Sequence, residues 1–309
     1  MIHFIINPHS SSGSGLSIWQ SLKPILQVSH ISYTAHLTEY PGHAIRLAGE
    51  ITSEAAADEC RLAIVGGDGT LNEVLNGAHL SSDVIFHYIP TGSGNDFARG
   101  MRLPVNPEKA MAHVLNPRSV HTLDYGTAQY GEGQHERRFV VSCGIGFDAA
   151  VCHNISYSRL KKLLNRMHLG KVAYLLIGIK QILQCKMING TLTVDGEDPI
   201  PLENTVFISC HNLAYEGGGF PFAPDALPDD GWLDLCVVTA GSRLRFTYLL
   251  LRSVLGGRHK TCKGVILRRI RQASIHLDKP LPVHTDGEVM GYFRDLDITC
   301  QPQDFRTGW

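Results

Sequence analysis

The sequence predicts an α/β domain followed by a β-rich, sandwich-like domain. In residues 1–125, short apolar runs alternate with helical patterns, which is typical of a parallel sheet with helices on both faces. After Asp124, strand-like segments follow one another with mostly turns between them, which favours an antiparallel sandwich or barrel. Apolar residues make up 43% of the 309 residues and charged residues 18%, so both domains can bury a core.

Each expected element of the first domain rests on a local pattern. A helix is expected over 41–58, because this segment opens with proline and then shows helical apolar spacing, and another after "SSSGSG". The strands are short apolar runs bounded by turn residues, namely 3–7, 32–38, 62–67 and 84–90.

The second half is expected to contain two helical stretches, near 156–187 and 242–256. Its strand-like segments are "RRFVVSCGIGFD", "NGTLTVDGE", "NTVFISC", "GWLDLCVVTA", "VILRRIRQASIHLD" and "PLPVHTDGEVM".

The net charge of −1 hides a marked segregation of charge. Residues 1–125 carry 7 Lys and Arg against 11 Asp and Glu, whereas residues 126–309 carry 21 against 18. Residues 149–194 contain seven basic side chains and residues 235–277 contain nine, and neither stretch has an acidic one. This pattern suggests a negatively charged partner.

Targeting and redox signals point to a cytoplasmic protein. The first residues lack the basic start of a signal peptide, and apolar stretches such as "VAYLLIGI" fall short of the ~20 residues of a membrane span. The eight cysteines form no CxxC pair and are expected to be reduced, and the sixteen histidines show no HExxH or other metal spacing.

The stretch "AIVGGDGTLNEVLNG" (63–77) places Asp68 in a glycine-rich turn between a buried strand and a helix. Glycines let backbone amides approach a ligand, and the helix start adds positive charge, so the turn can hold phosphate. A carboxylate there would repel phosphate unless Mg²⁺ lies between them. The alternative is an ordinary Asp-Gly turn, and this motif alone does not decide between the two.

Two further loops repeat this pattern after other strands. They are "NPHSSSGSG" (7–15) and "PTGSGNDFARG" (90–100), in which Asp96 could cap a helix or bind metal indirectly. The first could instead be a flexible Ser/Gly linker. The sequence lacks both a P-loop GxxxxGK[ST] and a GxGxxG fingerprint after the first strand, so it predicts a different kind of nucleotide site.

In this order and spacing, the three motifs resemble the diacylglycerol kinase catalytic-domain family. These soluble bacterial lipid kinases are related to sphingosine and ceramide kinases. The second half agrees in "GFDAAV" (146–151), "GGGFPFAPDALPDDGWLDL" (217–235) and "TDGE" (285–288), so the resemblance runs from Asn7 to Glu288. It implies a NAD-kinase-like α/β domain, a β-rich lipid-acceptor domain over 126–291, and a return of 292–309 to the first domain. It also implies a role in phospholipid biosynthesis.

The resemblance implies that ATP is the co-substrate and that Mg²⁺ is the metal ion. Asp68, and Asp96 with it, would link to a catalytic Mg²⁺ through water. In "LPDDGW", a structural Mg²⁺ would be held by backbone oxygens of Leu227 and Trp232 and by the Asp230 carboxylate. The expected ATP contacts are Asn7, Pro8, His9, Ser10, Ser11, Thr38, Gly66, Gly67, Asp68, Gly69, Thr70, Leu71, Asn72, Thr91, Gly92, Ser93, Gly94 and Asn95.

The same resemblance makes Glu288 the catalytic base, with Asp286 in its network and Asp68 as the third catalytic residue. The residues alone would rather indicate a hairpin carboxylate, because "DG" turns are common. One departure concerns the loop after Asn7-Pro8, which holds only Ser, Gly and His9 where many relatives carry Lys or Arg. Phosphate contacts there would come from backbone and hydroxyl groups.

The expected acceptor is a membrane-lipid hydroxyl, first of all that of diacylglycerol. Sphingoid bases, phosphatidylglycerol and prenols stay open, as do a soluble acceptor, as in NAD kinases, and a catalytically silent binding protein. Two basic stretches, 158–183 and 242–260, favour peripheral contact with an anionic membrane, at the inner face, over solvated basic helices. No nucleic-acid motif accompanies them, and a homodimer is left open.

Overall fold

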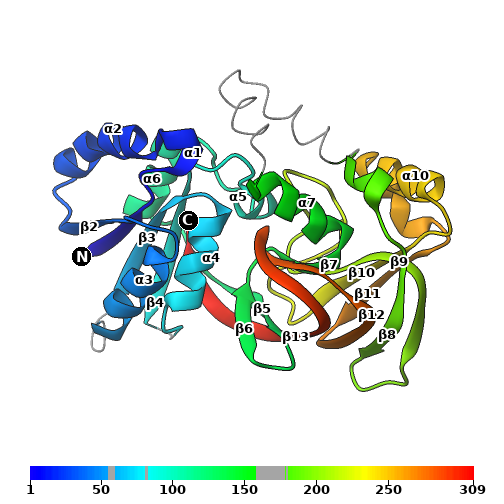
Figure 1. The fold of residues 1–309 in the computed structure, drawn as a ribbon. Coiled ribbons are helices and arrows are strands. Elements are labelled where there is room, and N and C mark those ends of the chain that lie inside the picture. Colours follow the sequence, from blue (N-terminus) through cyan, green and yellow to red (C-terminus); the bar gives the residue numbers. More distant parts are fainter. Residues whose placement is uncertain (55–59, 81–82, 158–177, 179) are drawn as a thin grey trace. The chain divides into compact units, whose positions relative to one another are not determined.

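The computed structural model describes residues 1–54, 60–80, 83–157, 178 and 180–309 (Figure 1). They form two compact units. Unit 1 comprises Met1–Tyr125 with Gln301–Trp309, and unit 2 comprises Gly126–Cys300.

Unit 1 is built on a parallel sheet in the order β2-β1-β3-β4. The end of the last strand of the chain joins the edge at β4, where Thr307 pairs with Phe86 in parallel. All four strands that the sequence predicts are present, and β4 has the predicted bounds. The strands are β1 (Ile2–Ile6), β2 (Tyr33–Leu37), β3 (Cys60–Gly66) and β4 (Val84–Pro90).

Six described helices surround this sheet, with α2 and α6 on one face and α3 and α4 on the other (Figure 1). Trp19 and Leu22 of α2 and Met111 of α6 pack on Phe4 and Val65. The helix expected after "SSSGSG" is present as α2, which begins at the last glycine of this motif, and the first four residues of the motif form the short helix α1. The helices are α1 (Ser10–Gly13), α2 (Gly15–Val28), α3 (His43–Glu54), α4 (Asp68–Gly77), α5 (Asp96–Gly100) and α6 (Pro107–Leu115).

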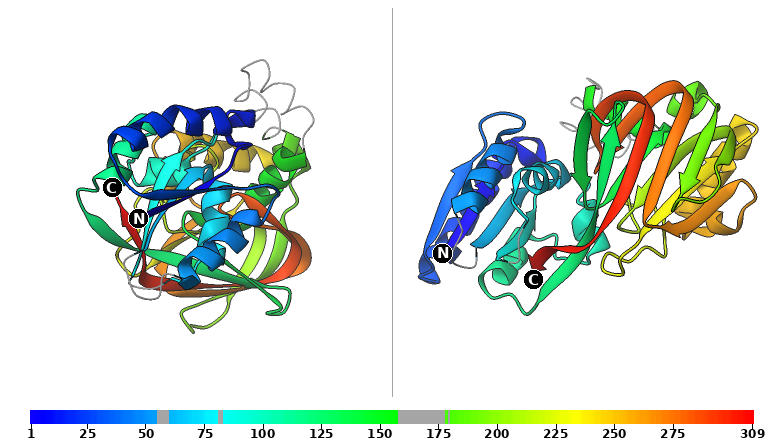
Figure 2. Two further views of the ribbon diagram at one scale, coloured as in Figure 1. Left: turned by 90° about the vertical axis from the view of Figure 1, so that its left-hand side faces the viewer. Right: turned by 90° about the horizontal axis from the view of Figure 1, so that it is seen from below.

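Unit 2 is antiparallel, in the order β11-β10-β9-β7-β12-β13, and its strands twist and curve around the core (Figure 2). The long strands β9 and β12 each pair with β7 along one part and with β8 along another, which gives the sandwich-like form. Seven strands lie wholly in unit 2, namely β6 (His135–Phe139), β7 (Ser142–Gly146), β8 (Ile188–Val194), β9 (Ile200–His211), β10 (Leu233–Thr239), β11 (Val265–Ile270) and β12 (Gln272–Thr285). Two strands run through both units, namely β5 (Val120–Tyr130) and β13 (Glu288–Gly308).

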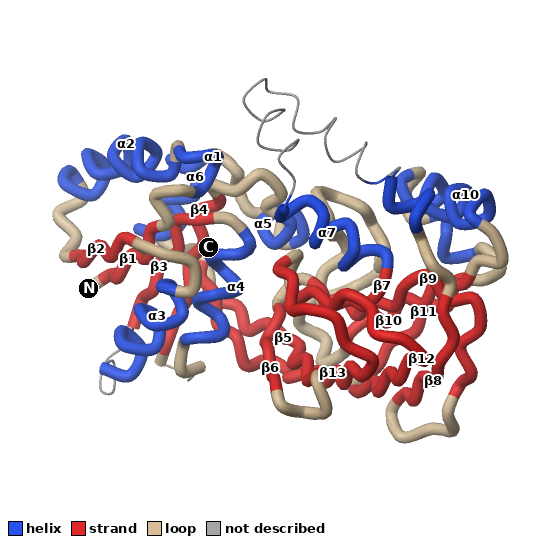
Figure 3. The backbone as a smooth tube through the Cα atoms, in the orientation of Figure 1, coloured by secondary structure: helices blue, strands red, loops and turns tan. Residues whose placement is uncertain are grey.

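Helices lie along these strands in Figure 3, and two of them matter for the site and the surface of unit 2. Helix α7 (Phe147–Tyr157) follows β7 directly, and α10 (Arg243–Val254) is followed by the 3-10 turn η1 (Arg258–Thr261). The predicted helix near 242–256 is therefore confirmed as α10. Most of the other predicted helix, near 156–187, lies outside the described residues.

Three predicted single strands are split. The hairpin turn at Asp286 and Gly287 divides "PLPVHTDGEVM" between β12 and β13. An aspartate explains each of the other two breaks. "RRFVVSCGIGFD" divides into β6 and β7, because the N–H groups of residues 140–142 donate to Asp286 instead of to a neighbouring strand. "VILRRIRQASIHLD" divides into β11 and β12, because Asp195 accepts from the N–H groups of Arg271 and Gln272 at 2.8 Å each.

The chain returns to unit 1 at Gln301, nine residues after the expected start of the return at residue 292. The reason is that β13 pairs with β12 as far as Thr299, and Leu296 and Ile298 are buried in the core of unit 2. Among the described residues, every helix is too short or too polar to cross a bilayer.

Candidate active site

In unit 1, the three glycine-rich motifs lie at the carboxyl ends of adjacent parallel strands. Residues 7–15 follow β1, residues 67–70 follow β3, and residues 91–96 follow β4. Ligands of open α/β sheets bind at this edge. The sheet order therefore brings together motifs that are up to about 85 residues apart in the sequence.

Hydrogen bonds connect these three loops directly. Asn7 Nδ2 donates to Thr70 Oγ1 at 3.0 Å, and Ser10 Oγ and Thr91 Oγ1 are 2.7 Å apart. The N–H of Thr91 donates to Gly66 O at 2.8 Å, which extends the β3–β4 ladder into the turns. The loop after β1 is thus tied to both of the others by side chains that the sequence proposed as ATP contacts.

Two glycines lie face to face where the second and third loops meet. A Cβ on Gly92 would lie 2.7 Å from the Cα of Gly67, and a Cβ on Gly67 would lie 3.1 Å from the Cα of Gly92. Gly92 is also held by Asn95, whose Oδ1 accepts from its N–H at 2.9 Å and whose Nδ2 donates to its carbonyl at 2.9 Å. Any side chain at these glycines would separate the loops, so the contact depends on glycine.

Asp68 begins α4 and points toward the start of α5. Its Oδ2 accepts from the N–H of Asp96 at 3.0 Å and its Oδ1 from the N–H of Phe97 at 3.3 Å. Asp68 thus lies where the loops after β3 and β4 meet. The indirect, water-linked metal role that the resemblance implied for Asp68 stays a prediction.

The other acid at this edge, Asp96, is buried and forms an ion pair with Arg99 at 2.5 Å. Sequence reasoning missed the neighbouring Tyr88 of β4. Burial raises the pKa of its hydroxyl well above the usual value, and the Asp68 and Asp96 carboxylates add to the effect. Its only signal in the sequence is a hydroxyl within a largely apolar strand.

The remaining predicted ATP contacts lie in or next to the same loops. Thr38 is buried directly after β2, and its N–H donates to Ile6 O at 2.8 Å. His9 and Ser93 are exposed. Leu71 and Asn72 are buried in α4, so their side chains are less suited to direct ligand contact. The others are Pro8, Ser11, Gly69 and Gly94, all partly buried.

In unit 2, the "TDGE" motif forms a two-residue hairpin turn between β12 and β13. Asp286 and Gly287 have φ of 49° and 82°, and Thr285 pairs with Glu288 across the turn. Positive φ at both central positions is the usual geometry of a tight hairpin. Glu288 is exposed at the start of β13, whereas Asp286 is buried. The turn thus presents one carboxylate outward and the other inward.

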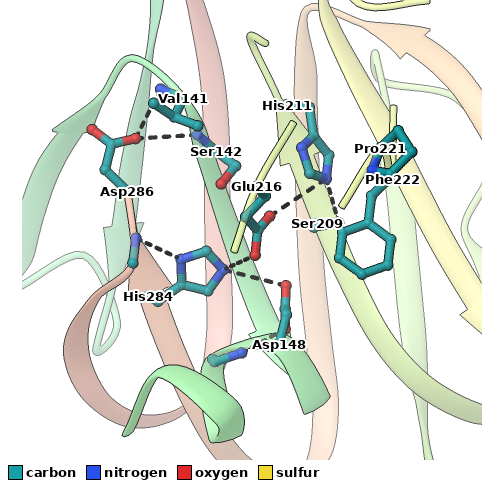
Figure 4. A network of polar contacts seen from close by, with 12 residues as sticks. Val141, Ser142, Asp148, Ser209, His211, Glu216, Pro221, Phe222, His284 and Asp286 are labelled. Atoms are coloured by element: carbon teal, nitrogen blue, oxygen red, sulfur yellow. Dashed lines mark hydrogen bonds and ion pairs between the residues drawn. The ribbon is translucent and has the colours of Figure 1, made fainter. Parts of the chain in front are cut away.

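The inward carboxylate of Asp286 is bound by backbone amides. Its oxygens accept from the N–H groups of Val140, Val141 and Ser142 at 2.8–3.2 Å, and its own N–H donates to Ser142 O at 2.8 Å (Figure 4). Hydrogen bonds of this kind stabilise the charged form. Asp286 therefore anchors the turn to the residues between β6 and β7.

A second buried network lies beside this anchor. His284 Nε2 lies 3.3 Å from Asp148 Oδ2 and 3.4 Å from Glu216 Oε1, and its Nδ1 accepts from the N–H of Gly287 at 3.2 Å (Figure 4). Burial lowers the pKa of His284, whereas the Glu216 and Asp148 carboxylates raise it. The Gly287 N–H needs a lone pair on Nδ1 and therefore favours the neutral ring. At the nearby His211, burial and His284 lower the pKa to about 3.

Among the described residues, Asp148, Glu216 and His284 also form a group whose ligand atoms are close enough to hold one metal ion. The Gly287 amide argues against this role. A metal-bound imidazole normally donates from its second ring nitrogen, and here that nitrogen accepts. We therefore interpret the group as a hydrogen-bonded support of the "TDGE" turn. Sequence reasoning missed it, although His284 directly precedes "TDGE" and Asp148 lies in "GFDAAV".

The "LPDDGW" loop offers a partner for Asp230 other than a metal. Asp230 Oδ1 accepts from the N–H of Trp232 at 3.1 Å, and Oδ2 forms an ion pair with Arg269. Arg269 also lies over the Trp232 ring, and the Leu227 side chain is exposed. A cation would have to displace Arg269 to reach this carboxylate, so the structural Mg²⁺ stays a prediction.

Comparisons with known families match both parts of the chain. The model of the diacylglycerol kinase catalytic domain matches residues 1–128, and that of the YegS C-terminal NAD kinase beta sandwich-like domain matches residues 141–307. These matches confirm the predicted fold classes, a NAD-kinase-like α/β domain and a β sandwich-like domain.

Individual relatives agree at modest identity. The protein YtlR of Bacillus subtilis (strain 168) is 29% identical over 290 residues, covering 93% of each chain. A protein of the same organism named diacylglycerol kinase is 28% identical over 255 residues, covering 81% of this chain and 79% of its own. A solved structure, titled as a diacylglycerol kinase from Bacillus anthracis str. Sterne, shares the fold with a TM-score of 0.76 at 23% identity. It covers 99% of this chain and 96% of its own.

These matches together span nearly the whole sequence, as the three glycine-rich motifs and "TDGE" did. The chain therefore belongs to the diacylglycerol kinase catalytic-domain family, and it is a lipid kinase, a phosphotransferase that uses ATP.

Proposed function

We propose that this lipid kinase transfers the γ-phosphoryl group of ATP to the free hydroxyl of diacylglycerol. ATP binding is supported by the convergence of three loops at one sheet edge, where the Ser10–Thr91 hydrogen bond and the Gly67–Gly92 contact join them. Diacylglycerol as the acceptor is supported by the family description and by the relative that is named diacylglycerol kinase.

Phosphoryl transfer requires positioning, charge neutralisation and a base for the attacking hydroxyl. The exposed amides of the glycine loops would receive the phosphates, because no Cβ blocks them. Asp68 and Asp96 would hold Mg²⁺ through water, and the ion would neutralise phosphate charge.

Glu288 would take the proton of the acceptor hydroxyl. Its exposure leaves it accessible, and the anchored Asp286 together with His284 would fix the turn that carries it. Asp286 is less suited to be the base, since amide N–H groups already occupy its oxygens. Asp286 is thus proposed as a positioning residue.

The test is a transfer assay with labelled ATP and Mg²⁺ against mixed micelles of diacylglycerol, a sphingoid base, phosphatidylglycerol or a prenol, with NAD as a soluble acceptor. Diacylglycerol should give the highest turnover. If another lipid gives the highest turnover, diacylglycerol is the wrong acceptor, but the protein is still a lipid kinase. Preference for NAD would overturn the lipid acceptor altogether.

Two variants separate the proposed roles in this assay. Glu288→Gln should lower turnover about 10²–10⁴-fold with ATP affinity unchanged, because glutamine cannot accept the proton. Asp68→Asn should instead weaken the dependence of nucleotide binding on Mg²⁺. Normal turnover of a folded Glu288→Gln variant would require a base elsewhere.

A further inference from the structure

Helix α10 of unit 2 has two apolar faces, and the core accounts for only one of them. Phe246, Leu249 and Ser253 are buried, and the two apolar residues pack on Phe207 and Val238 of β9 and β10. These positions are spaced by three and four residues, so they lie on one side of the helix. The inner face therefore explains how α10 is held on unit 2.

The opposite side carries a second stripe of large apolar side chains. Leu244, Tyr248, Leu251 and Leu255 are 84%, 46%, 59% and 59% exposed. Their spacing of four, three and four residues places them within a narrow sector, about 180° from the buried face. We name these four residues the α10 stripe. Single exposed apolar residues need no explanation, but an aligned row of four does.

Basic residues surround the α10 stripe. Arg243 and Arg245 are exposed in the first turn of α10, and Arg252 lies near its end. The following turn adds Arg258 and Lys260, of which Lys260 is paired with Asp225 at 2.8 Å. No Asp or Glu occurs between residues 235 and 277. The surface is thus apolar in its centre and cationic at its rim.

We propose that the α10 stripe docks this protein on an anionic lipid bilayer. A helix with an apolar outer face and a basic border can lie in the membrane interface, with the apolar side chains below the headgroups. The arginines would then meet anionic headgroups. The ring of Tyr248, with Arg245 5.6 Å from its centroid, suits the headgroup level.

The same charges argue against a second copy of the chain as the occupant. A two-fold contact through the α10 stripe would place the arginines of one copy against those of the other. Like charges brought together in an interface oppose association. An anionic bilayer instead offers an apolar interior for the α10 stripe and negative headgroups for the arginines around it.

The test is co-sedimentation of the full chain, without ATP or acceptor, with phosphatidylcholine vesicles that contain or lack phosphatidylglycerol. Leu244→Gln with Leu251→Gln removes half of the α10 stripe, and glutamine is a good helix former. Partitioning should fall roughly tenfold for each leucine lost. The matched control is Val28→Gln with Val105→Gln in unit 1, which are 79% and 62% exposed, and it should bind like the wild type.

The charge contribution is tested with Arg243→Gln and Arg245→Gln. Binding to anionic vesicles should fall about fivefold for each arginine, and high salt should abolish the difference. Lys23→Gln with Arg118→Gln removes equal charge from exposed positions of unit 1 and should change little.

Equal vesicle binding by the leucine variant and its control would overturn the proposal. A change in the sedimentation mass of the leucine variant, with vesicle binding retained, would assign the α10 stripe to a second copy. The assay contains no reaction, so its outcome is independent of the proposed acceptor. Phosphorylation of a water-soluble short-chain diacylglycerol should be the same for wild type and leucine variant.

Discussion

The backbone N–H of Gly287 donates to His284 Nδ1 at 3.2 Å, while the other ring nitrogen faces two buried carboxylates. One imidazole thus links Asp148 at the start of α7 and Glu216 after β9 to the turn that carries Glu288. Since Asp286 anchors the same turn to residues 140–142, the turn is held from two sides. This double support is what the proposed role of Glu288 as the base requires.

Replacing His284 by leucine should destabilise the protein strongly. The change leaves Asp148 and Glu216 buried without the imidazole, and loss of one partner of a buried charge cluster costs about 3–5 kcal/mol. His284→Gln can still donate to a carboxylate and should recover a large part of that loss. Urea denaturation of wild type and both variants measures the effect. Equal stability of the two variants would show that the hydrogen bonds of His284 are unimportant.

Asp286→Asn should lower stability by about 1–3 kcal/mol, because the amide NH₂ would face N–H donors of residues 140–142. If Asp286 positions the turn, turnover should fall with KM for ATP unchanged, and the acidic limb of the kcat–pH profile should remain. Chemical denaturation and a pH–rate profile test the two parts. Loss of that limb in Asp286→Asn would instead identify Asp286 as the base.

Gly92→Ala should weaken ATP binding at least tenfold, because the new methyl group would meet Gly67 and Asn95 and separate two loops of the proposed nucleotide site. Gly241→Ala is the matched control, since an added Cβ there meets nothing within 4 Å. Isothermal titration with a non-hydrolysable ATP analogue gives both affinities. If Gly92→Ala binds as tightly as Gly241→Ala, the contact between the loops is not needed for ATP.

The sequence predicted the parallel strands and the three glycine loops because their signals are local, consisting of apolar runs that end at glycines. It did not predict the breaks beside Val140 and Arg271, because each depends on an aspartate far away in the sequence, Asp286 and Asp195. The sequence did not predict the Asp148–Glu216–His284 network for the same reason, since each residue lies in a different segment. Long-range polar contacts leave no periodic pattern to find.

The stability of unit 1 should depend on pH through His87 of β4. Burial lowers the pKa of His87 to about 4, the nearby Arg61 adds to the effect, and the ring binds Gly308 O through Nδ1 at 2.8 Å. In the unfolded chain the pKa of His is about 6.5, so between pH 6.5 and 4 the unfolded chain binds a proton at His87 and the folded chain does not. The contribution of His87 to the unfolding free energy is therefore fully present above pH 6.5. It decreases as the pH falls from 6.5 to 4 and does not change further below pH 4.

His87→Gln keeps a donor for Gly308 O but cannot titrate, so it isolates this contribution. Between pH 7.5 and pH 4.5, the wild type should lose more unfolding free energy than the variant, by about 2–3 kcal/mol for this shift in pKa. Urea denaturation at both pH values measures the difference, and other titrating groups cancel because both proteins carry them. Parallel losses in the two proteins would mean that the pKa of His87 is the same in the folded and the unfolded state, so that burial does not shift it. A gain of the wild type over the variant at pH 4.5 would mean that the folded state raises the pKa of His87 above 6.5, with the ring bound to Gly308 O as a cation.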